Sequence, residues 1–254
     1  MYKLVENMVR ASEQPSVSWT GGAGFVIRTD DMLIGLDLYL SDACMQSNDD
    51  FKRLIPPPFE PEEIKLDYLI CTHEHGDHLD TGSLHKFINE KTNTMLVGTN
   101  TVVRECAKLG IASTRMIRLD RGESVRIGDV TVTAVLADHG DLSLDAIGVI
   151  ISIGGKAIYF TGDTCFRPDL PKLVPLPEKI DVLIVPINGK YGNPDAKDAA
   201  YITAWVRPKT VIPCHYWLFK EHGGDPGLFG QYCRAIAPDA KVKILAVGER
   251  FEME

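Results

Sequence analysis

Short apolar runs separated by turns occupy the first part of the chain and predict β-strands. These runs lie at Val17–Trp19, Gly24–Arg28, Met32–Leu38 and Leu66–Cys71. The last run has the continuous apolar pattern of a buried strand. A helix is predicted to begin at Asn100, where apolar residues recur at helical spacing until a glycine stops the pattern. The early part of the chain is therefore expected to be mostly sheet.

Further along, the pattern changes from hairpins to alternating strands and helices. Gly128-Asp129 and Gly154-Gly155 are each flanked by two apolar runs, which is typical of hairpins. These paired runs are Val125–Ile127 with Val130–Val135, and Ile147–Ile153 with Lys156–Thr161. Strands are then expected at Val182–Pro186, Thr210–Pro213 and Val242–Val247, and helices at Asp195–Val206 and Leu228–Ile236. Hairpins followed by crossovers indicate a mixed α and β sandwich, an α/β (α+β) fold.

No long polar linker divides the chain, so one domain spanning residues 1–254 is expected. The longest segment without a clear period is Ser41–Glu63, which includes Pro56-Pro57-Pro58. Because long aperiodic loops in globular domains are often functional, we expect this one to serve the site.

Composition and charge exclude several classes of protein. Apolar residues make up 44% of the 254 residues, too many for a disordered chain, and no apolar run is long enough for a membrane span. The formal net charge of −8 argues against a nucleic-acid partner, since phosphate-binding surfaces need clustered Lys and Arg. Six widely spaced cysteines without a CxxC pair are expected to be reduced thiols, and no secretory signal is expected in the first residues, which have no apolar run. A cytoplasmic protein is expected.

Three histidines and an aspartate are concentrated directly after the predicted strand Leu66–Cys71. They are His73, His75, Asp77 and His78. Packing does not call for several imidazoles in one short segment, because burying them without partners is costly. Clustered imidazole and carboxylate groups are ligands that suit Zn, Mn or Fe. We therefore interpret the segment as a metal-binding loop.

Three further candidates, His139, Asp163 and His215, each follow a predicted strand. Strand ends gather side chains at one edge of a sheet, where sites in layered α/β folds form. Taken singly, each residue could be a loop or core residue. Taken with the histidine cluster, they complete a set of seven candidate metal ligands.

The order His73-x-His75-x-Asp77-His78, His139, Asp163, His215 resembles the metallo-β-lactamase superfamily over nearly the whole chain. The resemblance implies a four-layer αβ/βα sandwich of the metallo-β-lactamase type. It also implies one or two divalent metal ions, Mn²⁺ or Zn²⁺, and a metal-dependent hydrolase that uses a metal-bound hydroxide.

Carried over position by position, the resemblance gives each candidate a role. The first metal would be held by His73, His75 and His139, the second by Asp77, His78 and His215, with Asp163 bridging them. Asp77 or Asp163 would be the catalytic residue that receives the water proton. Asp37 matches the superfamily's early aspartate, which supports the ligands, and Asp80 is expected to act in the same way.

A finer resemblance is to the L-ascorbate-6-phosphate lactonase branch. It rests on Trp19–Gly24, Pro58-Phe59, Asp80, Tyr191–Asn193, and Val211–His215 followed by Asp225-Pro226. It implies that a phosphorylated sugar lactone is opened. The chain departs from the branch in its brevity, and in His139, a position that is not reliably histidine there.

Substrate contacts are expected from Lys190, Tyr191, Asn193 and Trp217, with Lys197 and Arg167 as further candidates for a phosphate. The expected partner is a small molecule, without nucleic acid or membrane, and a homo-oligomer is plausible by resemblance. Two other functions stay open: a metal-dependent phosphodiesterase of the same fold, and a redox or metal-sensing protein on this scaffold. The di-iron redox branch has Glu where this chain has His75, which disfavours the last.

Overall fold

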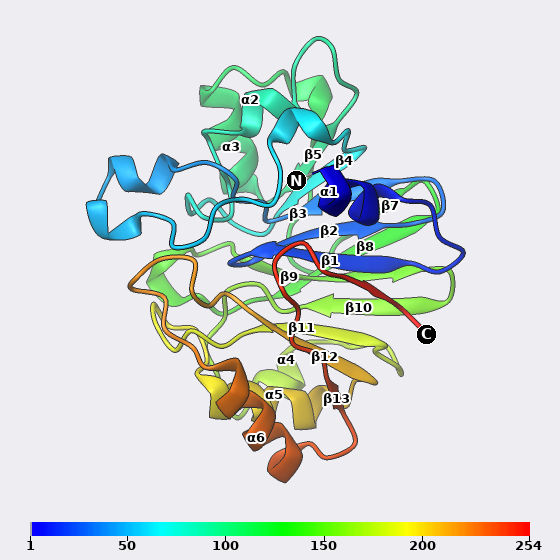
Figure 1. Ribbon diagram of the computed structural model, residues 1–254, viewed down its shortest axis with the longest axis vertical. Helices are drawn as coiled ribbons and strands as arrows, with labels where there is room; N and C mark the ends of the chain where they lie inside the picture. Colours follow the sequence, from blue (N-terminus) through cyan, green and yellow to red (C-terminus); the bar gives the residue numbers. More distant parts are fainter. Residues whose placement is uncertain (1) are drawn as a thin grey trace. The chain divides into compact units, whose positions relative to one another are not determined.

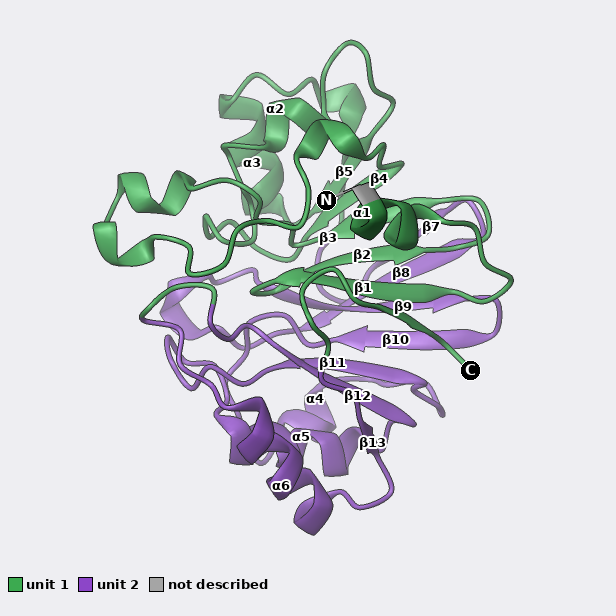
Figure 2. Cartoon of the chain, in the orientation of Figure 1, with its two compact units in different colours: residues 1–119, 218–220, 245–254 green, residues 120–217, 221–244 purple. Residues whose placement is uncertain are grey.

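The succession of antiparallel strands and then parallel strands occurs twice along the chain, once in each of two seven-stranded sheets (Figure 1). The computed structural model describes residues 2–254. These residues form two units, coloured separately in Figure 2. Unit 1 comprises residues 1–119, 218–220 and 245–254, and unit 2 comprises residues 120–217 and 221–244. The single domain expected for residues 1–254 stays a prediction.

The sheet of unit 1 has the order β14-β1-β2-β3-β4-β5-β6. Its strands are β1 (Ser16–Gly21), β2 (Gly24–Arg28), β3 (Leu33–Leu36), β4 (Tyr68–Cys71), β5 (Met95–Gly98), β6 (Met116–Arg118) and β14 (Arg250–Glu252). The pairs from β14 to β3 are antiparallel, and those from β3 to β6 are parallel. The carboxyl ends of the parallel strands therefore share one edge, where the histidine-rich loop begins.

The sheet of unit 2 has the order β13-β12-β11-β10-β9-β8-β7. Its strands are β7 (Ser124–Ile127), β8 (Val130–Leu136), β9 (Ile147–Ile153), β10 (Lys156–Phe160), β11 (Val182–Pro186), β12 (Thr210–Cys214) and β13 (Lys241–Val242). The pairs from β7 to β10 are antiparallel, and those from β10 to β13 are parallel. Every residue of β11 and β12 is buried, which explains their continuous apolar sequences.

The helices of the described residues are short, with at most 11 residues each. They are α1 (Tyr2–Val9), α2 (Leu84–Phe87), α3 (Asn100–Lys108), α4 (Leu170–Leu173), α5 (Ala196–Val206) and α6 (Pro226–Ile236). The Asp195 carboxylate caps α5, and the Asp225 carboxylate caps α6, whose first position is a proline. These two helices pack against each other in unit 2. None of the helices between residues 2 and 254 has the length and apolar character needed to cross a membrane.

The core of unit 1 is built from buried aliphatic and aromatic side chains of strands and helices, among them Leu69, Leu96 and Phe87. At Gly24 neighbouring atoms lie so close to the backbone that there is no room for a side chain. A Cβ atom there would lie 2.3 Å from the Thr20 hydroxyl and 3.2 Å from the Asp37 carbonyl oxygen. The glycine thus lets β2 pass next to the end of β3, where Asp37 is located.

Most predicted elements are confirmed, with ends shifted by a few residues. The strand predicted at Val242–Val247 is wrong beyond its first residue, because β13 ends at Val242 and the chain then leaves the sheet of unit 2. It returns to unit 1, where β14 pairs with β1. The helix α1 and the strands β5, β6 and β14 were not predicted. The aperiodic Ser41–Glu63 segment contains three single-turn 3₁₀ helices, at Ala43–Gln46, Asp49–Phe51 and Pro61–Glu63.

Candidate metal centre

In unit 1, Asp37 orients His78. Nδ1 of His78 lies 2.7 Å from Oδ2 of Asp37, and neither side chain is exposed to solvent. Because a carboxylate only accepts hydrogen bonds, Nδ1 carries the hydrogen, and the lone pair of the neutral imidazole is on Nε2. Histidines that bind metals are commonly oriented by a carboxylate in this way.

The same carboxylate holds Thr72, the first residue after β4. The Thr72 amide donates to Oδ1 of Asp37 at 2.8 Å, and its hydroxyl donates to Oδ2 at 2.6 Å. The hydroxyl oxygen also lies 3.1 Å from Nδ1 of His73. Asp37 thus contacts one histidine directly and a second through Thr72.

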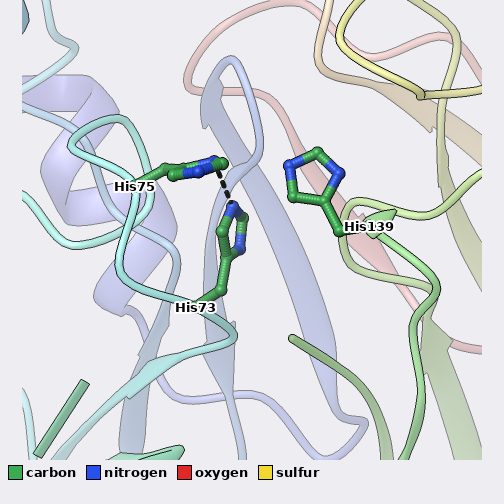
Figure 3. A group of neighbouring side chains, drawn as sticks. All are labelled: His73, His75 and His139. Carbon is green, nitrogen blue, oxygen red and sulfur yellow. Dashed lines mark hydrogen bonds between the residues drawn. The ribbon is translucent and has the colours of Figure 1, made fainter. Parts of the chain in front are cut away.

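His73 and His75 bring two ring nitrogens together, as Figure 3 shows. Nε2 of His73 lies 2.9 Å from Nδ1 of His75. His139, also labelled in Figure 3, belongs to unit 2. The His73 ring is fully buried and packs against the His78 ring, with 4.1 Å between centroids. Asp37, His73 and His78 form a cluster whose side-chain atoms are close enough to hold a metal ion.

Asp77 and Asp80 differ in their surroundings within this loop. Asp77 is partly exposed, with Oδ2 3.9 Å from Nε2 of His78. Asp80 is buried and accepts hydrogen bonds from the amides of Leu40, Ser41 and Gly82 and from the hydroxyls of Ser41 and Ser83. Asp80 therefore fastens the end of the histidine loop to the segment after β3.

In unit 2, Asp163 follows β10 and lies between two histidines. Its Oδ2 is 3.3 Å from Nε2 of His215, which follows β12, and 3.8 Å from Nε2 of His139, which follows β8. All three side chains are almost fully buried. The strand ends thus bring together the three residues that sequence analysis singled out in this unit.

Asn193 holds the Asp163 carboxylate in place. Its side-chain amide donates to Oδ2 of Asp163 at 2.7 Å, and its Oδ1 accepts from the Thr164 amide at 3.0 Å. Asn193 is 7% exposed. The substrate contact expected of Asn193 stays a prediction, but its observed partners are Asp163 and the adjoining backbone.

The other expected substrate residues lie at the surface of unit 2. Lys190 is exposed, Tyr191 is 46% exposed and Trp217 is 47% exposed. The indole nitrogen of Trp217 donates to the Gly224 carbonyl at 2.9 Å. Both aromatic rings could therefore meet a ligand from solvent.

His222 is a residue whose setting the sequence did not reveal. It is only 5% exposed. Its ring packs against that of His215, with 4.6 Å between centroids. The signal available in the sequence was its position seven residues after His215 in the same loop.

Left-handed backbone conformations are concentrated at these candidates. Asp37, Tyr191, His215 and Trp217 have φ values of 45°, 52°, 59° and 56°. Non-glycine residues in this region carry a conformational cost that the surrounding fold must offset, and such residues cluster at functional sites. Among the described residues, the fifth non-glycine example is Arg207, which ends α5.

Arg167, a candidate for binding phosphate, is already engaged by carboxylates. Its guanidinium donates to Asp138 at 2.7 Å and to both oxygens of Asp169 at 2.5 and 2.7 Å. The hydrogen bond from Arg167 lowers the pKa of Asp138 below its ordinary value. Binding a phosphate would have to displace these partners, which argues against this role.

The chain is similar to known proteins at two levels, that of the superfamily and that of the family. Residues 38–216 match the family model described as a beta-lactamase superfamily domain, which places the chain in the metallo-β-lactamase superfamily. The chain is 30% identical to a UPF0173 metal-dependent hydrolase of Archaeoglobus fulgidus, over 93% of this chain and 98% of the relative. It is 31% identical to a UPF0173 metal-dependent hydrolase of Hyperthermus butylicus, over 93% and 98%. The chain therefore belongs to the UPF0173 family of metal-dependent hydrolases.

The fold is also shared with Igni18, a metallo hydrolase from Ignicoccus hospitalis. The TM-score is 0.72 at 23% identity, covering 95% of this chain and 100% of Igni18. The predicted fold class, the metallo-β-lactamase α/β fold with two mixed sheets and helices, is confirmed. The matches support the superfamily and not the finer lactonase branch.

Proposed function

We propose, from the superfamily resemblance, that the histidines of unit 1 and His139, Asp163 and His215 of unit 2 are ligands of hydrolytic metal ions. The first ion would be held by His73, His75 and His139, and the second by Asp77, His78 and His215, with Asp163 shared between them. The observation that carries the proposal is Asp163 itself, whose Oδ2 has Nε2 atoms of two buried histidines at 3.3 and 3.8 Å.

The residues fit such ions in their chemistry and spacing. Zinc–nitrogen bonds of about 2.0–2.1 Å place two ligand nitrogens of a tetrahedral ion roughly 3.3 Å apart. The observed 2.9 Å between Nε2 of His73 and Nδ1 of His75 is close to that spacing. Imidazole and carboxylate ligands suit both Mn²⁺ and Zn²⁺, so the donor set accommodates either ion.

A bound divalent ion would supply Lewis acidity to a water molecule and to the group under attack. The chain's own residues prepare this chemistry. Asn193 fixes the direction of the Asp163 carboxylate, and Asp37 fixes that of His78. Asp77 is partly exposed, and its carboxylate is the group that we assign to accept a proton from water.

For the substrate, we propose a sugar lactone that carries a phosphate. Support comes from the sequence resemblance in Trp19–Gly24, Tyr191–Asn193 and Val211–His215. Exposed Tyr191 and Trp217 could flank such a ring, and the exposed ammonium groups of Lys190 and Lys197 could attract the phosphate. A cytoplasmic location also belongs to this proposal, supported by six widely spaced cysteines without a CxxC pair.

The proposal is tested by hydrolysis with defined metals. The protein is stripped with a chelator, reloaded with Mn²⁺ or Zn²⁺, and offered phosphorylated lactones, plain lactones and an aryl phosphodiester. We expect metal-dependent lactone opening that is faster with the phosphate and is abolished in Asp163→Ala. His85→Ala, at an exposed histidine outside the ligand set, is the matched control and should retain activity. Phosphodiester cleavage without lactone opening would contradict the lactone substrate while leaving the metal centre intact.

A further inference from the structure

We infer that Thr72 is a positioning residue that sets the tautomer of His73. This tautomer leaves a lone pair on Nε2, the ring nitrogen that lies next to His75. The hydrogen-bond assignment requires no metal. Its consequence for metal affinity rests on the proposed function.

The Asp37 carboxylate is the acceptor at the end of this chain of hydrogen bonds. Asp37 is fully buried and receives the Thr72 amide at 2.8 Å, the Thr72 hydroxyl at 2.6 Å and Nδ1 of His78 at 2.7 Å. Three donors around one side chain match an ionised carboxylate, which has no hydrogen to give. The Thr72 hydroxyl must therefore be the donor in its contact with Asp37.

A hydroxyl has a single hydrogen, so toward His73 the Thr72 oxygen can only accept. The contact of 3.1 Å between this oxygen and Nδ1 of His73 then requires the hydrogen to be on Nδ1. In the neutral imidazole the lone pair is consequently on Nε2, the atom that lies 2.9 Å from His75. His78 has the same tautomer for the simpler reason that its Nδ1 donates to Asp37 directly.

One buried carboxylate thus fixes two histidines, one directly and the other through a hydroxyl. Thr72 can act in this way because it follows β4 immediately and its backbone amide is tied to the same carboxylate. Histidines that bind metals commonly donate their second nitrogen to such an acceptor, and removal of the acceptor costs roughly 10–100-fold in metal affinity. A valine at this position keeps the shape of threonine and removes the hydroxyl that contacts both Asp37 and His73, while the backbone amide still donates to Asp37.

The variants are Thr72→Val, which lacks the hydroxyl, and Thr72→Ser, which restores it. The matched control is Thr94→Val. Thr94 is also buried in unit 1 and donates a 2.6 Å hydrogen bond, but its acceptor is the Leu66 carbonyl and not a ligand-bearing group. His78, bonded directly to Asp37, is an internal control in every sample.

The readout is long-range ¹H–¹⁵N NMR of the histidine rings in chelator-treated protein, with the His73 signals assigned from His73→Gln. We expect His73 and His78 to carry hydrogen on Nδ1 in the wild type, in Thr72→Ser and in Thr94→Val. In Thr72→Val, His73 should shift to the Nε2–H form while His78 is unchanged. Affinity for Zn²⁺ should fall about 10-fold in Thr72→Val and recover in Thr72→Ser.

A wild-type His73 with hydrogen on Nε2 would overturn the inference, and so would an unchanged His73 tautomer in folded Thr72→Val. If Thr72→Val does not fold, the spectra of the wild type and of Thr72→Ser still test the inference, because they show which nitrogen of His73 carries the hydrogen. If His73 has the expected tautomer but the protein binds no metal and hydrolyses nothing, the proposed function fails and the hydrogen-bond assignment stands.

Discussion

The side-chain amide of Asn193 donates to Oδ2 of Asp163 over 2.7 Å. The same amide group accepts from the Thr164 backbone, so it is fixed at both of its polar atoms. Asp163 therefore meets His139 and His215 in one orientation, although its own strand, β10, ends at Phe160. This relationship makes Asn193 a sensitive place to test the centre.

Replacing Asn193 with Ala should lower metal affinity about 10–100-fold, because the carboxylate loses the donor that orients it. Isothermal titration with Mn²⁺ and Zn²⁺ measures the effect. Asn89→Ala is the matched control, since Asn89 also bonds backbone groups through its amide but lies in unit 1 near the exposed His85. Equal affinities in the two variants would show that Asn193 does not orient a ligand.

Asp37→Asn should weaken metal binding while the fold is retained. Asparagine tolerates the left-handed conformation found here, with φ of 45°, so the backbone need not change. The new amide nitrogen donates and cannot accept, so at least one of the donors from Thr72 and His78 loses its partner. Competition with a chromophoric chelator should show a loss of about 10–100-fold in affinity with a native circular dichroism spectrum. Wild-type affinity would refute the role of Asp37 in orienting His78.

Asp80 is expected to matter for stability and not for metal content. Asp80→Ala removes the acceptor of five hydrogen bonds that join the histidine loop to Leu40, Ser41, Gly82 and Ser83. Buried donors left without partners cost about 1–3 kcal/mol each, so urea unfolding should show a loss of at least roughly 2 kcal/mol. The ratio of bound metal to protein, measured by mass spectrometry, should not change. A lower ratio in the folded variant would indicate that Asp80 acts on the metal itself.

The cysteines should differ in reactivity according to their burial. Burial raises the pKa of the Cys106 thiol to about 12 and that of Cys233 to about 11, so both are neutral at pH 8. Because the thiolate is the reactive form, these two residues should resist a disulfide reagent until the protein unfolds. The partly exposed Cys165 should react faster than either. Mass spectrometry of the labelled native protein checks this order, and early labelling of Cys106 would contradict it.

The sequence locates the histidine-rich loop because the loop directly follows a strand with a simple apolar pattern. It also predicts His139, Asp163 and His215 at strand ends, where the structure of unit 2 places them. The contacts between side chains could not be predicted from the sequence. Thr72 has no distinguishing pattern in the sequence, and Asn193 was assigned to the substrate although it bonds to Asp163.

The short strands β13 and β14 could not be predicted from the sequence either, for physical reasons. Val242–Val247 has a strand-like composition, but only β13 (Lys241–Val242) pairs with β12 before the chain returns to unit 1. The three-residue β14 carries too few positions for an alternating pattern, and its pairing with β1 joins residues more than 230 positions apart. Such long-range pairing overrides local propensity, which is all that a single sequence reveals.

The proposed metal ligands are tested most directly by a crystal structure of metal-loaded protein with anomalous scattering collected at the Mn or Zn absorption edge. We expect anomalous peaks bonded to Nε2 of His73 and to Oδ2 of Asp163, with the remaining ligands drawn from His75, Asp77, His78, His139 and His215. Loaded crystals with no peak at these residues, or with peaks only at other side chains, would contradict it.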